Sequence, residues 1–154
     1  MQNTLCYGDN LAVLRHHVRD ASVDLAYLDP PFNSSQDYNL LFRGVDGGEA
    51  PAQVQAFRDT WRFDARSNRE LEELVQRGDR VGDLMHSFRA LLDANGMMAY
   101  LTMMAPRLLE VRRALKPAGS VYLHCDPTAS HYLKLLMDAV FGAENFRNEI
   151  VWKR

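Results

Sequence analysis

The sequence predicts a layered α/β fold. Short apolar runs typical of buried strands occur at residues 4–8, 23–28 and 120–125, and stretches with helical periodicity lie between them. Such alternation of strands and helices is typical of layered α/β architectures. The chain has 154 residues, of which 47% are apolar and 25% charged, so it has the length and composition of one globular domain.

The composition excludes several other classes of protein. Its ordinary apolar and charged fractions exclude a disordered acidic tail and a collagen-like rod. The mean hydropathy is −0.31, and the longest nearly apolar run, residues 97–105, is too short to span a bilayer, so we expect no membrane partner. Two cysteines cannot build a disulfide framework, which favours a reduced, cytoplasmic protein. The net charge of −2 is unlike that of a small stand-alone nucleic-acid binder.

The first elements are a predicted strand and a predicted helix. The run at residues 4–8 is typical of a short buried strand that ends at Asp9. Either Asp9 or Asn10 is placed to cap a helix over residues 11–18, because the side-chain oxygen of such a residue accepts a hydrogen bond from the first backbone N–H groups of a helix.

The second strand, residues 23–28, runs directly into Asp29-Pro30-Pro31. Two consecutive prolines lack two backbone donors, so a paired strand cannot continue through them. In an open α/β sheet, ligands bind at the carboxyl ends of the strands. A carboxylate on a rigid loop, followed by the flat ring of Phe32, is suited to accept hydrogen bonds from an amino group and to stack on a planar base. A plain turn with an aspartate cap is the alternative interpretation.

A long polar segment with three glycines follows and predicts a loop that is mobile without nucleic acid. Helical periodicity resumes over residues 52–61 and again over residues 68–94. The chain is therefore expected to consist of an α/β core, residues 1–33 and 95–154, and an insertion, residues 34–94, that holds the mobile loop and helices.

The strongest helical pattern covers residues 97–115, where apolar side chains recur in steps of three and four. Pro106 falls inside this pattern, so we expect a kink or a break there. Residues 116–119, Lys-Pro-Ala-Gly, are typical of a helix stop.

The strand at residues 120–125 is followed by a capped helix. Asp126 is a predicted N-cap, and Pro127 suits the first helical position. The helix is expected over residues 128–141, with Gly142 as its end. Another strand is predicted to begin near Glu149.

Potential metal ligands cluster at and after the end of the strand predicted at residues 120–125. They are His124, Cys125, Asp126 and His131. Side chains alternate along a strand, so His124 and Cys125 are expected on opposite faces, and Asp126 is explained as a helix cap. The sequence therefore predicts no metal site.

The segments from Tyr7 to Asn10 and from Asp24 to Asn33 resemble the amino-methyltransferases of DNA, whose motif IV reads Asp, Asn or Ser followed by Pro-Pro and an aromatic residue. More of the chain resembles the site-specific adenine methyltransferases of type III-like modification systems, which have the β-type motif order. The segments concerned are residues 60–64, 100–109, 113–126 and 148–154. The resemblance implies a partial Rossmann-like methyltransferase sheet with helices on both faces and a helical insertion after motif IV.

The resemblance also implies an activity and the residues that perform it. The activity is transfer of a methyl group from S-adenosylmethionine to the exocyclic amine of adenine in DNA. The catalytic loop would be Asp29-Pro30-Pro31-Phe32, with the Asp29 carboxylate and the Pro30 carbonyl accepting hydrogen bonds from the amine and Phe32 stacking on the flipped base.

Three further residues receive expected roles from the same resemblance. Asp9 would face the adenine of the cofactor, although a role as helix cap alone is an equal alternative. Asn33 and Tyr38 would contact the substrate, Asn33 by extending motif IV and Tyr38 by closing over the base; packing within the loop is the alternative for Tyr38.

The chain departs from the family in one respect. The family holds the methionine end of its cofactor with a Phe-x-Gly-x-Gly-like loop, and none of the nine glycines here forms Gly-x-Gly. We therefore expect a chain with only the motif IV to motif VIII portion and an incomplete S-adenosylmethionine site. The expected partners are double-stranded DNA with a flipped adenine, and a missing C-terminal half or second subunit. The alternatives are a catalytically inactive orphan fragment, a split subunit that needs a partner, and an RNA or protein amine methyltransferase.

Overall fold

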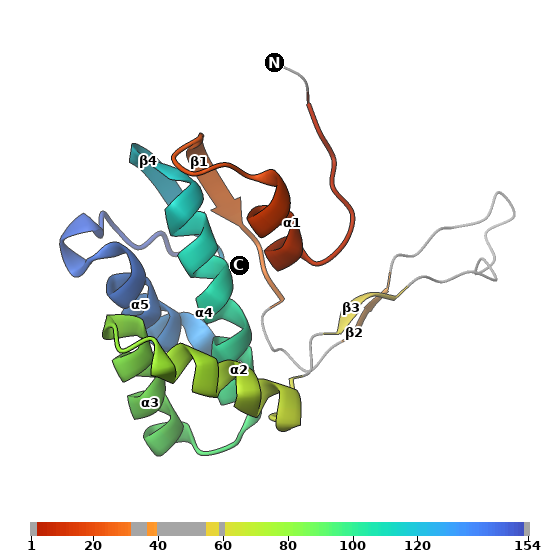
Figure 1. Ribbon diagram of the computed structural model, residues 1–154, viewed down its shortest axis with the longest axis vertical. Coiled ribbons are helices and arrows are strands. Elements are labelled where there is room, and N and C mark those ends of the chain that lie inside the picture. The colour runs from red at the N-terminus through yellow and green to blue at the C-terminus, as the bar shows by residue number, and fades with distance from the viewer. Residues whose placement is uncertain (1–2, 32–36, 40–54, 59–60, 153–154) are drawn as a thin grey trace, which may run out of the picture.

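A computed structural model describes residues 3–31, 37–39, 55–58 and 61–152, with only the backbone course for the two short middle segments. Within these ranges the chain forms five α-helices, a two-stranded parallel sheet and a two-stranded antiparallel pair (Figure 1). The predicted α/β class, with a partial parallel sheet, is confirmed.

The parallel sheet joins two segments that lie about ninety residues apart in the chain. Strand β1, Val23–Leu28, pairs with strand β4, Leu115–Leu123. The pairing is regular from Leu25 to Leu28, and Leu28 lies beside Leu123 at the carboxyl end. The Lys-Pro-Ala-Gly segment does end the preceding helix, as predicted, but it also forms the first half of β4.

The two faces of this sheet have different surroundings. Leu28 and Leu123 point to one face and pack against the helical core. Tyr27 and Tyr122 point to the other face, where they are exposed and their rings stack with centroids 6.3 Å apart. The helical core thus covers one face, and the described residues show no equivalent packing on the other, where helices were also expected.

Each α-helix begins after an Asp or Asn whose side chain accepts a hydrogen bond from a backbone N–H of the first turn. The predicted caps Asp9 and Asp126, and the end at Gly142, are confirmed. The helices are α1 (Asn10–His17), α2 (Ala65–Gln76), α3 (Arg80–Leu92), α4 (Gly96–Ala114) and α5 (Pro127–Phe141), and a 3-10 turn, η1 (Ala143–Asn145), follows α5. No helix in these ranges has the length and apolar character needed to cross a membrane.

Helix α4 lies at the centre of the core, with the other helices around it (Figure 1). Of the kink or break expected at Pro106, the break does not occur, because α4 continues through the proline as one helix. Buried residues lie on both sides of the proline, among them Leu101 and Leu108, and their packing outweighs the loss of one backbone hydrogen bond.

Two predicted strands are absent from the structure. Residues 4–8 and the segment from Glu149 to Trp152 form neither helix nor strand, and the side chains of Leu5, Tyr7 and Trp152 are exposed. A strand requires a hydrogen-bonding neighbour. Within the described residues, β1 pairs with β4, and β2 (Asp37–Asn39) pairs with β3 (Gln55–Arg58), so these two segments have no partner strand.

The insertion also differs from prediction. Strands β2 (Asp37–Asn39) and β3 (Gln55–Arg58) pair antiparallel, so the helix predicted over residues 52–61 is wrong at β3. The helical stretch predicted over residues 68–94 is divided into α2 and α3, and Gly78, with a φ of 64°, lies in the turn between them. Most of the loop predicted to be mobile lies outside the described residues.

At Gly82 the backbones of α2 and α3 approach each other closely. A β-carbon there would lie 2.7 Å from the carbonyl oxygen of Leu74 and 3.1 Å from that of Val75. We expect Gly82→Ala to destabilise the fold by about 1–3 kcal/mol in urea unfolding, because the backbone of α2 must move. Ser87→Ala, at an exposed position of α3, is the control and should change stability by less than about 0.5 kcal/mol. Equal stability of the two variants would contradict the prediction.

Candidate functional site

The carboxyl end of β1 carries the predicted catalytic loop. Asp29 directly follows the strand, and its side chain is 61% exposed. Pro30 and Pro31 are half-buried and continue the chain away from the sheet. The carboxylate is therefore accessible while the backbone behind it is restricted by two proline rings.

A histidine from the neighbouring strand contacts this carboxylate. Nδ1 of His124 lies 3.1 Å from Oδ1 of Asp29, and the His124 side chain is 55% exposed. The backbone N–H of His124 also donates to the carbonyl oxygen of Leu28 at 2.8 Å, which extends the β1–β4 pairing by one residue. The sheet itself thus brings Asp29 and His124 together.

Sequence reasoning weighed His124 only as a metal ligand and missed its contact with Asp29. The described residues contain no group of three or more His, Cys, Asp or Glu side chains that could hold a metal ion. The contact could have been inferred from the two predicted strands, at residues 23–28 and 120–125, if they are paired. In a parallel sheet, the residues that follow two paired strand ends lie side by side.

Asp9 is held at the start of α1 by two donors. Its Oδ1 accepts hydrogen bonds from the backbone N–H of Leu11 at 2.9 Å and from Nη2 of Arg107 at 2.7 Å. Arg107 belongs to α4 and also donates from Nε to Oδ1 of Asn10 at 2.8 Å. One guanidinium group therefore fixes the beginning of α1 against the central helix.

These contacts set the charge of Asp9. Burial alone would raise the pKa of its carboxyl group, but the Leu11 N–H and the Arg107 guanidinium together lower it below its ordinary value. The carboxylate is ionised at neutral pH and remains 48% exposed, so it has lone pairs left to accept a hydrogen bond from an amino group. The predicted role as helix cap is confirmed, and the predicted contact with a cofactor stays a prediction.

The beginning of α1, which Asp9 caps, lies on the same side as the carboxyl end of β1, which Asp29 follows. Helix α1 runs antiparallel to β1, so it begins on the side toward which the β1 arrow points (Figure 1). Three further predicted site residues are not placed beside them: Phe32 and Asn33 lie outside the described residues, and Tyr38 is described only as part of the backbone of β2.

The Cys125 thiol does not show the features of a catalytic nucleophile. Burial raises the pKa of the Cys125 thiol, and the neighbouring carboxylates of Asp126 and Glu149 raise it further. The thiol therefore stays protonated at neutral pH, and a protonated thiol is a poor nucleophile. Cys6 is an exposed free thiol in the segment before α1.

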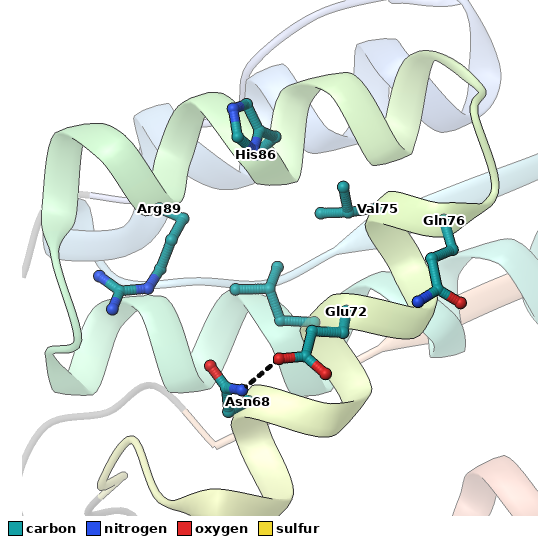
Figure 2. Close-up of a pocket in the computed structure, with 7 residues that line it drawn as sticks. Asn68, Glu72, Val75, Gln76, His86 and Arg89 are labelled. Atoms are coloured by element: carbon teal, nitrogen blue, oxygen red, sulfur yellow. Dashed lines mark hydrogen bonds between the residues drawn. The ribbon is translucent and has the colours of Figure 1, made fainter.

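A separate cavity of about 300 Å³ lies between α2 and α3 (Figure 2). Polar side chains from both helices line it, including Glu72 and Gln76 of α2 and His86 and Arg89 of α3. Glu72 accepts a hydrogen bond from Asn68 at 2.6 Å within α2. None of the lining residues belongs to the Asp29 loop or to the start of α1, so this cavity is distinct from the candidate site.

Loss of the Asp9 cap should cost stability in a pH-dependent way. We expect Asp9→Ala to destabilise the fold by about 1 kcal/mol at neutral pH in urea unfolding. The folded-state pKa of Asp9 is lowered, so its stabilisation is present above its ordinary value and is lost as the pH falls through the lowered pKa. The two proteins should therefore converge in acid. Asp9→Asn, which can still cap the helix, should lose less stability, and a difference that is constant with pH would contradict the prediction.

Comparison with known proteins adds a family match. A family model for a DNA methylase, N6_N4_Mtase, matches residues 23–154, which include Asp29 and His124. The Mod subunit of the type III restriction-modification enzyme StyLTI from Salmonella typhimurium is 30% identical over 99% of this chain, and the match covers 20% of that protein.

Two further curated proteins show similar coverage. The EcoP15I Mod subunit of Escherichia coli is 29% identical over 99% of the chain and 21% of its own length. The EcoPI Mod subunit of Escherichia phage P1 is 34% identical over 94% of the chain and 20% of its own length. The chain therefore spans about a fifth of the length of these relatives.

Proposed function

We propose that this chain, which belongs to the N6_N4_Mtase family of DNA methylases, supplies the catalytic loop of a methyltransferase that modifies the exocyclic amine of adenine in DNA. The observation that carries the proposal is the Asp29-Pro30-Pro31 loop at the carboxyl end of β1, where an open α/β sheet binds its ligands. The similarity to three Mod subunits of restriction-modification enzymes supports DNA as the substrate class.

The target amine requires activation because its lone pair is delocalised into the base ring. In the proposed mechanism, the Asp29 carboxylate and the Pro30 carbonyl accept hydrogen bonds from the two N–H groups of the amine. These acceptors favour a tetrahedral nitrogen with a localised lone pair as attack begins. The stabilisation grows toward the transition state and therefore raises the rate. No covalent enzyme intermediate is needed, which agrees with the protonated state of Cys125.

The base must leave the duplex to reach this loop, at a cost of a few kcal/mol. We propose that Phe32 stacks on the extruded adenine, where base–aromatic stacking is worth about 1–3 kcal/mol. Pro31 keeps the backbone between the carboxylate and this ring restricted. Asn33 and Tyr38 are proposed to contact the substrate from the segment that follows.

S-adenosylmethionine is the proposed methyl donor: when bound it would supply an electrophilic methyl group and leave as a neutral thioether as its S–C bond breaks, and the methylated amine would lose one proton to water. Asp9 fits the adenine end of this cofactor, because its ionised, half-exposed carboxylate can accept a hydrogen bond from an amino group. The methionine end has no matching Gly-x-Gly loop in this sequence. We propose that a further segment or a second subunit completes the cofactor site, and that the complete protein binds double-stranded DNA.

Transfer of label from tritiated S-adenosylmethionine tests this function. The complete protein, with any further sequence or subunit it has, is incubated with DNA, RNA or protein, and the labelled nucleoside is identified after digestion. We expect label on the exocyclic amine of adenine in DNA. Label on cytosine would show that adenine is not the target base. Label on RNA or protein would show that DNA is not the substrate. No label on any of the three would favour a catalytically inactive chain.

A further inference from the structure

We propose that His124 is a positioning residue that holds the carboxylate of Asp29 in the orientation needed for catalysis. The inference rests on the proposed function and goes beyond it by adding a residue from the second strand. Nδ1 of His124 lies 3.1 Å from Oδ1 of Asp29, and no part of the proposed mechanism had used this contact.

The sheet determines the position of both side chains. Leu28 and Leu123 form the last in-register pair of β1 and β4, and Asp29 and His124 are the residues that follow them. The hydrogen bond from the backbone N–H of His124 to the carbonyl oxygen of Leu28 fixes the two chains at this point. The imidazole is therefore presented to the carboxylate by rigid backbone, which is the arrangement that preorganised sites require.

The chemistry of the contact indicates which imidazole nitrogen carries the hydrogen and how the Asp29 carboxylate is oriented. An ionised carboxylate can only accept hydrogen bonds, so Nδ1 of His124 must carry the hydrogen. This bond occupies Oδ1 of Asp29 and restricts rotation of the carboxylate about its last torsion. Because the carboxylate cannot rotate freely, its second oxygen, Oδ2, also has a fixed direction. Oδ2 remains available to accept a hydrogen bond from the amine of the base.

The contact has little to contribute to folding. Both side chains are more than half exposed, and exposed pairs of this kind stabilise proteins only weakly. Removal of the imidazole should therefore leave the fold intact while the Asp29 carboxylate becomes free to rotate. A small misalignment of a reacting group is enough to lower the rate substantially, by up to about 100-fold.

The kinetic test compares three variants of the complete protein. We expect His124→Phe to lower kcat by roughly 10- to 100-fold while KM for DNA and for S-adenosylmethionine changes by less than about threefold. His124→Asn should recover most of the activity, because an amide nitrogen can donate from nearly the position of Nδ1. The control is His131→Phe, at an exposed histidine of α5, which should behave as wild type.

A spectroscopic test examines the contact between His124 and Asp29 without relying on methyltransferase activity. The ¹⁵N shifts of the His124 imidazole should report hydrogen on Nδ1, and Asp29→Ala should abolish this preference. A wild-type kcat in His124→Phe, equal impairment of the Phe and Asn variants, or unchanged ¹⁵N shifts in Asp29→Ala would each overturn the inference. A wild-type protein that labels no adenine in DNA would overturn the proposed function instead, and the ¹⁵N result would still decide the contact.

Discussion

Asp29→Ala is expected to reduce methyl transfer to below about a tenth of the wild-type rate while DNA affinity stays within a few-fold. The carboxylate acts on the amine as its nitrogen becomes tetrahedral, so its loss raises the energy of the transition state rather than that of the bound complex. Asp29 is exposed and follows the last residue of β1, so its truncation leaves the paired part of the sheet unchanged. Label transfer measures the first quantity, and fluorescence anisotropy of labelled DNA measures the second.

Asp24→Ala is the matched control for this experiment. Asp24 is an exposed aspartate within β1, the strand that Asp29 follows, and its carboxylate forms an ion pair with Nζ of Lys116 at 2.8 Å. Removal of this surface pair should cost less than about 1 kcal/mol and leave turnover near the wild-type rate. Turnover of Asp29→Ala above a tenth of wild type, or equal losses in the two variants, would contradict the role assigned to Asp29.

Features determined by neighbouring residues could be predicted from the sequence. The caps at Asp9 and Asp126 follow from short side chains that bond to backbone N–H groups two or three residues away. The end of β1 follows from the missing donors of Pro30 and Pro31, and this also located the candidate catalytic loop.

Features that depend on distant partners were missed or predicted wrongly. The apolar run at residues 4–8 has a strand-like pattern, but the pattern does not indicate whether a neighbouring strand exists. Contacts between residues far apart in the sequence were also not predicted: His124 lies 95 residues from Asp29, and Arg107 lies 98 residues from Asp9. The continuity of α4 at Pro106 is another example, because the local rule favours a kink or a break and packing on both sides keeps the helix unbroken.

The second large effect is expected in the core, at Leu101 of α4. This side chain is 0% exposed and belongs to the apolar cluster that α4 shares with α2, α3 and α5. We expect Leu101→Ala to lower the free energy of unfolding by about 2–5 kcal/mol, because it removes buried methyl groups and leaves a cavity among side chains that relax only partly. Since small domains are stable by only about 5–15 kcal/mol, the variant should lose much of its stability.

Leu91→Ala separates this packing effect from the chemistry of the substitution. Leu91 lies on α3 and is 70% exposed, so the same change from leucine to alanine removes side-chain atoms that already contact water. Its cost should be less than about 0.5 kcal/mol. Urea unfolding followed by far-UV circular dichroism measures both variants. Similar midpoints for Leu101→Ala and Leu91→Ala would mean that α4 is not the centre of the core, because a truncation at a fully buried position must cost more than one at an exposed position.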